Sequence, residues 1–408
     1  MIFNFLKNKI VKSILFYLTI KTYYYKGLKK QDLLICDDIF PNPISGFRLE
    51  EFTQILKEIP NSKIDVSGKS YQLLNSSKTQ FLIDIYELKK KYLFIKNRIK
   101  VNCRFINTNC NLFYCIFINN IYENLFWLEN YKIPFAFTLY PGGGFQVNNS
   151  LSDHKLKKVL SSPQFRKVIV TQLFTKEYLI KNNFCTADKI IYIFGCVVPQ
   201  ESLKKQIDLK EYYPKKETFD IIFCAAKYMP KGLDKGYDVF IELAHNLIKK
   251  YDFIRFHVVG GFNKDDIDVS QLNNKITFHG YQKFEDLADI YQKMDIILSP
   301  NKPFLYHEGA FDGFPLGTVI EAVFNGVVAL VTDNLNQNTV FENDKEIIII
   351  DNNVSSIQNE IVNLIQNPNK LKIISKNGRE KFLEIYSNDF QMNPRIELLR
   401  NEITSKYD

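Results

Sequence analysis

Residues 296–332 read IILSPNKPFLYHEGAFDGFPLGTVIEAVFNGVVALVT, and this stretch decides the fold. It begins with a short apolar run over 296–298 and continues through a loop that carries acids and glycines. A helical pattern then opens near Gly317 and stops at Asn325-Gly326, where glycine can close a helix. A second apolar run over 327–332 follows. A strand, a helix and a second strand in this order predict an α/β unit around a buried parallel sheet.

The same alternation extends outward in both directions from this stretch. On the C-terminal side of the chain the apolar runs predict strands over 219–225, 255–259, 276–278 and 346–350, helices over 237–250 and 285–294, and two final helices. On the N-terminal side they predict strands over 33–37, 135–139, 168–171 and 190–194. The chain is therefore predicted to be an α/β protein with two Rossmann-like, doubly wound parallel-sheet domains.

Composition agrees with a folded protein of this size. The chain has 408 residues, of which 46% are hydrophobic and 24% charged, with 17 Gly and 14 Pro. These values exclude a disordered, collagen-like or linker-dominated protein. No apolar run reaches the roughly 18 residues that a membrane-spanning helix needs.

The domain boundaries follow from polar breaks. A charged stretch over 200–216, flanked by Pro199 and containing Pro214, is the best linker candidate. We therefore predict a basic amphipathic segment over 1–30, an N-terminal domain over 31–213 and a C-terminal domain over 214–385. Residues 386–408 form a predicted helical tail, for which a return to the N-terminal domain stays open.

Charge is concentrated at the N-terminus. Residues 1–30 contain seven lysines and no acid, so they supply seven of the net eight positive charges. The remainder is nearly neutral, which argues against a nucleic-acid-binding surface. Apolar residues at spacings of three and four in this segment predict an amphipathic helix. Such a helix could lie on an anionic membrane surface or pack on the protein itself, and both readings stay open.

The seven cysteines are read as buried thiols. Their number is odd, no CxxC pair occurs, and several lie within apolar runs. No small-residue cleavage site follows the apolar stretch near the N-terminus. We therefore expect a cytoplasmic protein, with peripheral association on the inner face of the membrane as an option.

The loop and helix over 299–322 carry the most chemistry. In a doubly wound sheet, ligands bind where a strand ends and a helix begins. Backbone amides around Leu316 to Val319 would suit a phosphate. Glu321 in the second helical turn could accept hydrogen bonds from a ribose diol, and Asp312 could reach a sugar hydroxyl. The alternative reading is a connection whose acids only cap the helix.

This stretch resembles the acidic-pair signature of retaining GT-B glycosyltransferases of family 4. In that family an acid-Gly-Phe loop leads into a helix with a second acid followed by Ala, as in Asp312-Gly313-Phe314 and Glu321-Ala322. The two acids stand nine residues apart here, where the family usually has eight. Glu308-Gly309 is a rival for the first acid.

A second stretch, 219–238, resembles the same family. Its strand ends in a cation, Lys227, and Lys235-Gly236 follows eight residues later. The resemblance implies that the two lysines hold the donor diphosphate. Lys227 replaces the more usual Arg, which keeps the charge but loses bidentate geometry. Residues 137–145 together with 312–315 resemble a bacterial subgroup associated with surface-polysaccharide assembly.

The resemblance implies a GT-B fold with an interdomain cleft, and transfer of a sugar from a nucleotide-sugar to a saccharide or lipid-linked saccharide with retention. The acceptor would bind on the N-terminal side and the donor on the C-terminal side. Catalytic roles would fall to Lys227, Lys235 and Asp312. Donor binding would involve Glu308, Gly313, Phe314, Leu316, Gly317, Thr318 and Glu321.

Three further features bear on the chemistry. Gly142, Gly143 and Gly144 would allow close backbone approach in the cleft. The family often places a His in this region, and none occurs over 135–145. Asp266-Ile-Asp268 matches a metal-binding DxD but follows Gly260-Gly261 in a polar loop, so we expect no metal site and no cofactor beyond the nucleotide-sugar substrate.

Two other function classes stay open. One is a nucleotide-sugar enzyme of the same fold that is not a transferase, such as an epimerase. The other is a non-catalytic, membrane-associated scaffold that uses the N-terminal helix. The joint presence of Lys227, Lys235 and Glu321 favours the transferase.

Overall fold

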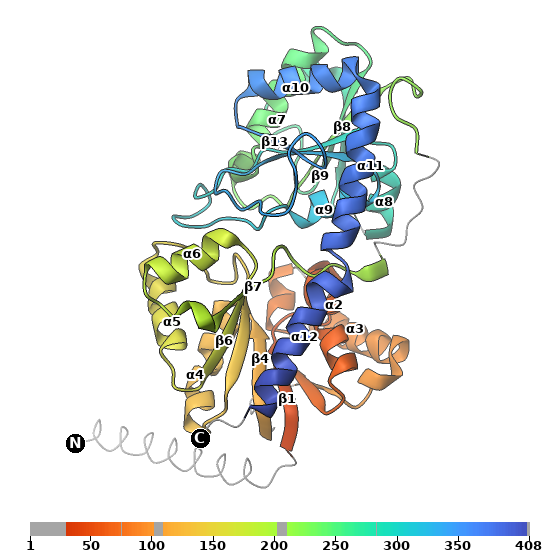
Figure 1. Cartoon of the computed structure of the whole chain (residues 1–408). Helices are drawn as coiled ribbons and strands as arrows, with labels where there is room; N and C mark the ends of the chain where they lie inside the picture. The colour runs from red at the N-terminus through yellow and green to blue at the C-terminus, as the bar shows by residue number, and fades with distance from the viewer. Residues whose placement is uncertain (1–29, 75, 102–108, 202–209, 283, 406–408) are drawn as a thin grey trace, which may run out of the picture.

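The computed structural model consists of two α/β domains, one above the other in Figure 1. It describes residues 30–74, 76–101, 109–201, 210–282 and 284–405. The basic segment predicted over 1–30 thus lies almost entirely outside the described residues. No helix in these ranges is long and apolar enough to cross a membrane.

The N-terminal domain is built on a parallel sheet of seven strands in the order β3-β2-β1-β4-β5-β6-β7. Its strands are β1 (Lys30–Asp37), β2 (Ser62–Val66), β3 (Ile99–Val101), β4 (Asn109–Ile116), β5 (Phe135–Leu139), β6 (Phe165–Val170) and β7 (Ile190–Tyr192). Its helices are α2 (Gly46–Glu58), α3 (Lys78–Lys91), α4 (Ile118–Asn130), α5 (Ser150–Leu160) and α6 (Leu173–Lys181).

The C-terminal domain has a parallel sheet of six strands in the order β10-β9-β8-β11-β12-β13. Its strands are β8 (Phe219–Cys224), β9 (Ile254–Val259), β10 (Ile276–Gly280), β11 (Ile296–Ser299), β12 (Val328–Thr332) and β13 (Ile348–Ile350). Its helices are α7 (Tyr237–Ile248), α8 (Phe284–Tyr291), α9 (Gly317–Phe324), α10 (Val354–Gln366) and α11 (Pro368–Ile385).

Both sheets are buried on two faces, which explains the continuous apolar runs. All six residues of β8 are buried. Phe219, Ile221 and Phe223 pack into one apolar core, while Ile222 and Cys224 pack into the core on the opposite face. The predicted doubly wound fold is confirmed, and every strand expected in the C-terminal domain is present.

Three strands of the N-terminal sheet were not among those expected from the sequence. Strands β2 and β3 are short and carry polar residues such as Asp65, so they lack a continuous apolar run. Strand β4 begins with the polar Asn109 and Asn111, but its second half, residues 112–116, is a buried apolar run that does predict a strand. The two final helices of the C-terminal domain are α10 and α11, and the helical tail predicted over 386–408 is present as α12 (Asn388–Thr404).

Helix α12 crosses back to the N-terminal domain, where it packs against α2 and β4 (Figure 1). Its Arg395 is fully buried. The guanidinium lies 3.9 Å from the Glu51 carboxylate and donates a hydrogen bond of 3.3 Å to the Tyr140 hydroxyl. A buried charge is costly unless it is paired, so this network fixes α12 in one place on the N-terminal domain.

The described part of the predicted linker is bound to the C-terminal domain. The Tyr212 hydroxyl donates a hydrogen bond of 2.8 Å to the Gly326 carbonyl. The Lys210 ammonium donates to the carbonyls of Tyr291 and Asn325, which end helices α8 and α9. Residues 210–216 therefore belong to the surface of this domain, whereas 202–209 lie outside the described residues.

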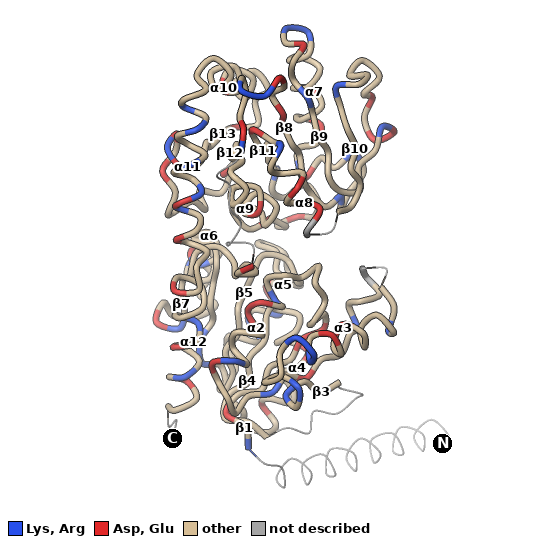
Figure 2. The backbone as a smooth tube through the Cα atoms, turned by 90° about the vertical axis from the view of Figure 1, so that its right-hand side faces the viewer, with Lys and Arg blue, Asp and Glu red and all other residues tan. Residues whose placement is uncertain are grey.

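Charged residues of both signs are interspersed over the two domains (Figure 2). The described cysteines are all free. Four of them are buried as expected, and Cys185 and Cys196 are half-buried.

Candidate active site between the two domains

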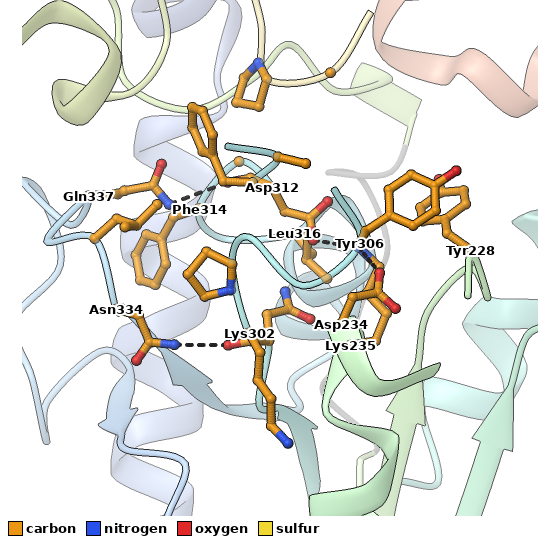
Figure 3. Close-up of a pocket in the computed structure, with 18 of the residues that line it drawn as sticks. Tyr228, Asp234, Lys235, Lys302, Tyr306, Asp312, Phe314, Leu316, Asn334 and Gln337 are labelled. Carbon is orange, nitrogen blue, oxygen red and sulfur yellow. Dashed lines mark hydrogen bonds and ion pairs between the residues drawn. The ribbon is translucent and has the colours of Figure 1, made fainter. Parts of the chain in front are cut away.

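A pocket of about 500 Å³ lies between the two domains. The N-terminal domain contributes Phe117 and the loop that follows β5, residues 141–146. The C-terminal domain contributes Tyr228, Asp234 and Lys235 after β8 and the long loop after β11 (Figure 3). It also contributes the end of β12 and residues that follow it: Val331, Thr332, Asn334, Leu335 and Gln337. The pocket thus lies at the carboxyl ends of strands from both sheets, the usual ligand position in doubly wound folds.

Lys235 is the central cation of this pocket. Its side chain is only 5% exposed, and its ammonium forms an ion pair with Asp312, which is 37% exposed. The Asp234 carboxylate lies 3.5 Å from the same ammonium, and the Tyr228 ring centroid lies 5.0 Å from it. Burial opposes the charged form, but Asp312 and Asp234 outweigh it and raise the pKa of Lys235. The lysine therefore stays protonated.

Several buried oxygen atoms in the pocket lining lack a hydrogen-bond donor among the described residues. They are Oδ1 of Asp234, Oδ1 of Asn301 and Oε1 of Gln337. The Gln337 side chain is held in place by its other end, because its Nε2 donates a hydrogen bond of 3.3 Å to the Asp312 carbonyl. Buried acceptors without partners are costly, so this lining fits a ligand that brings hydroxyl donors.

The three predicted cleft glycines line the pocket, and two of them permit close packing. Gly143 has a φ of +55°, and a Cβ there would lie 2.1 Å from the Phe117 ring. Gly144 has a φ of +91°, and a Cβ would lie 2.1 Å from the Asn119 side-chain oxygen. Side chains are excluded at both positions, so the backbone itself forms this wall of the pocket.

The start of α9 faces this region, as the sequence predicts. Leu316 occupies the N-cap position and provides no side-chain cap for the first amides. Gly313, Phe314 and Leu316 line the pocket, while Gly317 and Thr318 follow immediately in the first turn. The Thr318 hydroxyl donates to the Cys224 carbonyl at 2.8 Å, which ties α9 to the end of β8. The Val319 amide is not free, because it bonds to the Leu316 carbonyl.

Glu321 lies in the second turn of α9 but outside the pocket lining. The side chain is half-buried, and desolvation raises the pKa of its carboxyl to about 7. A desolvated acid of this kind can titrate near neutral pH and can accept donors from a ligand.

Lys227 is not in the same pocket as Lys235. It lines a neighbouring pocket with Tyr228, Gly261, Asp266 and Tyr281, and it forms an ion pair with Asp266. Tyr228 lines both pockets and therefore lies between the two lysines.

The DxD carboxylates are engaged within the protein. Asp266 pairs with Lys227, and Asp268 accepts a hydrogen bond of 2.9 Å from the Ser270 amide. No cluster of three or more potential metal ligands occurs in the described ranges.

The two rival acids differ in position. Asp312 lines the pocket and contacts Lys235, whereas Glu308 is exposed and lines neither pocket. Of these two acids, only Asp312 is placed in the pocket.

The sequence did not single out several residues that line the pocket: Tyr228, Asp234, Asn301, Tyr306 and Gln337. Only for Asp234 did the sequence offer a signal that it belongs to the site, because it directly precedes Lys235. The others lie in loops whose paths the sequence pattern does not specify.

Comparison with known proteins finds sequence similarity in the C-terminal half of the chain. Residues 205–381 match the family model of glycosyl transferases group 1. The C-terminal domain is therefore similar to glycosyltransferases of this group. Mannosylfructose-phosphate synthase from Agrobacterium fabrum is 30% identical over 112 residues, which are 24% of this chain and 23% of that enzyme.

Solved structures share the complete two-domain fold. A glycosyltransferase from Rickettsia africae has a TM-score of 0.61 and 18% identity, over 93% of this chain and 100% of that one. Anabaena HepE in complex with UDP and glucose has a TM-score of 0.63 and 12% identity, over 92% and 100%. Sucrose-phosphate synthase from Thermosynechococcus elongatus has a TM-score of 0.57 and 14% identity, over 91% and 98%. The expected GT-B fold is thereby confirmed.

Proposed function

We propose that this protein transfers a sugar, with retention, from a nucleotide-sugar to a hydroxyl of a saccharide or lipid-linked saccharide. The main support is the buried Lys235 ammonium beside Asp312 in the interdomain pocket. Solved structures of HepE, which shares the fold, contain UDP, UDP-glucose, or UDP with glucose. This similarity supports a nucleotide-sugar donor.

The departing diphosphate would carry the charge that the site must stabilise. A preorganised, buried cation does this without reorganisation. Lys235 would contact the diphosphate, assisted by the backbone amides of Gly317 and Thr318 at the positive end of α9. Lys227 would reach the same group only after leaving Asp266.

Hydroxyl-bearing parts of the substrates would meet the unpartnered oxygens. Asp312 would accept a hydrogen bond from the donor sugar, and Asn301 and Gln337 provide further acceptors. Glu321 would accept the ribose hydroxyls. We assign no covalent nucleophile.

A membrane-bound acceptor would fit the basic N-terminal segment. Seven lysines over 1–30 would attract anionic lipids at about 1 kcal/mol per residue near the surface. We propose a cytoplasmic enzyme held on the membrane by this segment and acting in surface-polysaccharide assembly. Loss of binding to phosphatidylglycerol vesicles on deletion of residues 1–29, with an unchanged melting temperature, is the expected result. Unchanged vesicle binding together with a lower melting temperature would reject the membrane role.

The direct test of function is product analysis. The purified protein is incubated with UDP- and GDP-sugars and a panel of saccharide acceptors, with and without EDTA. We expect release of the nucleoside diphosphate and a glycosylated product that retains the anomeric configuration, at the same rate with the chelator. An epimerised donor without transfer would support the epimerase, and unchanged substrates would support the scaffold.

A further inference from the structure

Two exposed tyrosines stand together at one end of the pocket. Tyr228 is 58% exposed and Tyr306 is 44% exposed, and their ring centroids are 5.8 Å apart with an interplanar angle of 40°. Figure 3 shows the two rings side by side, with Gln337 and Phe314 at the other end and Asp312 between. Large aromatic side chains usually bury most of their surface, so this pair presents unused ring area to the pocket.

The loop that carries Tyr306 is fixed to both domains. On the C-terminal side, the Lys302 amide donates to the Asp234 carbonyl at 2.9 Å. On the N-terminal side, the Val147 amide donates to the Gly309 carbonyl at 2.9 Å, and Gly309 has a φ of +73°. A Cβ at Gly309 would lie 1.8 Å from the Val147 carbonyl oxygen, so only glycine allows this contact.

Phe311 strengthens the same attachment. It belongs to the C-terminal domain but packs into the core of the N-terminal domain, with ring centroids 5.7 Å from Phe145 and 5.3 Å from Phe174. The hydrogen bond of 2.7 Å from the Phe304 amide to the Ala310 carbonyl closes the loop in between. Tyr306 is therefore held in a defined place relative to both domains, which is what preorganised recognition requires.

We propose that Tyr228 and Tyr306 form the binding subsite for a pyranose ring of the acceptor. A pyranose has an apolar face of C–H groups and a rim of hydroxyls. A tyrosine ring offers an apolar face and a polar hydroxyl at its edge, and so matches both features. The inference rests on the proposed function, because it places this ring beside the donor-site pair Lys235 and Asp312.

Two other occupants, an aliphatic lipid chain and a nucleobase, can be distinguished from a pyranose. An aliphatic lipid chain would leave the tyrosine hydroxyls and the nearby Asp234 and Asn301 oxygens without partners. A nucleobase would also stack on a tyrosine, but Tyr306 would then contribute to binding of the free nucleotide. The experiment separates these cases.

The test is saturation-transfer NMR on the full chain with methyl glycosides of glucose, galactose, mannose and N-acetylglucosamine, each in the presence of UDP or GDP. Tyr306→Ala should weaken glycoside binding roughly tenfold, as loss of an aromatic contact would. Tyr306→Phe should retain the binding. Leu305→Ala is the matched control, because Leu305 is 50% exposed in the same loop but does not line the pocket.

The outcomes distinguish a failure of the proposed function from a failure of the tyrosine subsite. Thermal stabilisation by UDP or GDP should be equal in all four proteins, and its absence from the wild type would contradict the proposed function. If the nucleotide binds but no glycoside does, or if Tyr306→Ala leaves glycoside binding unchanged, the subsite is refuted. Loss of nucleotide binding in Tyr306→Ala would also overturn it, in favour of a nucleobase. Melting temperatures without ligand show that the variants are folded.

Discussion

Lys235 is the residue on which the proposed mechanism depends most. It is buried, protonated and paired with an acid that faces the interdomain pocket. Lys227, expected to share its role, contacts Asp266 in the neighbouring pocket. We therefore expect mutations of the two lysines to affect the transfer rate differently.

Lys235→Ala should lower the transfer rate by an amount on the order of 10²-fold, the effect of removing one preorganised electrostatic group. Initial rates at saturating donor measure this. Lys264→Ala is the control, since Lys264 is exposed and lines neither pocket. A variant that turns over at the normal rate would remove Lys235 from the donor site.

Asp312→Asn should have opposite effects on binding and on catalysis. The carboxylate occupies the Lys235 ammonium in the ligand-free protein, so a diphosphate must compete with it. Removing the negative charge should tighten binding of UDP or GDP in calorimetry, while transfer slows because the sugar loses its acceptor. Weaker nucleotide binding in this variant would show that Asp312 does not compete with the phosphate.

Glu321 predicts a pH dependence of nucleotide binding. The pKa of its carboxyl is raised to about 7 in the free protein. A ribose diol donates to the ionised form, so binding should strengthen as the pH rises through 7, by about tenfold between pH 6 and pH 8. Phosphate also titrates with a pKa of about 6, so the measured quantity is the difference between the wild type and Glu321→Gln. Identical pH profiles would exclude the ribose contact.

At the scale of elements, sequence pattern and structure agree best where strands are buried on both faces. The six strands of the C-terminal sheet follow from apolar runs such as 219–225. Strands β2 and β4 contain Asp65 and Asn111, and their positions depend on pairing with β1, which local pattern does not specify.

Some residues of the candidate site can be predicted from sequence motifs, and others cannot. Asp312, Gly313 and Lys235 follow from short motifs in the sequence, and the structure brings them together in the pocket. Whether they act as proposed stays a prediction. Tyr306 and Gln337 reach the pocket through loop geometry that involves both domains, and no short-range pattern specifies it.

The buried Asp65 carboxyl on β2 should make the stability of the fold depend on pH. Both carboxylate oxygens are buried without a hydrogen-bond partner among the described residues. Burial raises the pKa from 3.8 to about 6, against the weaker opposing effect of Lys100 and Lys63. The folded state thus loses stability as the pH rises from 4 through 6, by about 3 kcal/mol in total.

Asp65→Asn removes this titrating charge. Its melting temperature relative to the wild type should therefore be higher at pH 8 than at pH 5, as measured by calorimetry. Asp84→Asn serves as the control, because Asp84 is half-buried in α3 and its carboxylate is hydrogen-bonded to Tyr71 and Gln80. An equal difference at both pH values would show that the Asp65 carboxylate is not desolvated as described.

At the scale of the whole molecule, several segments of the described chain join the two domains. Residues 193–201 leave β7 toward the C-terminal domain, α12 returns to the N-terminal domain, and the loop after β11 inserts Phe311 between Phe145 and Phe174. The pocket lies between these connections, so both sheets determine its shape. A ligand that bridges the domains should stabilise the whole chain.

Thermal unfolding with nucleoside diphosphates tests the central claim most directly. A ligand at 100 times its dissociation constant adds about 2.7 kcal/mol to the stability of the folded state. We predict that UDP or GDP raises the melting temperature of the wild type and that the increase is much smaller in Lys235→Ala. No shift with either nucleotide, or an equal shift in Lys235→Ala, would contradict a nucleotide-sugar site at Lys235.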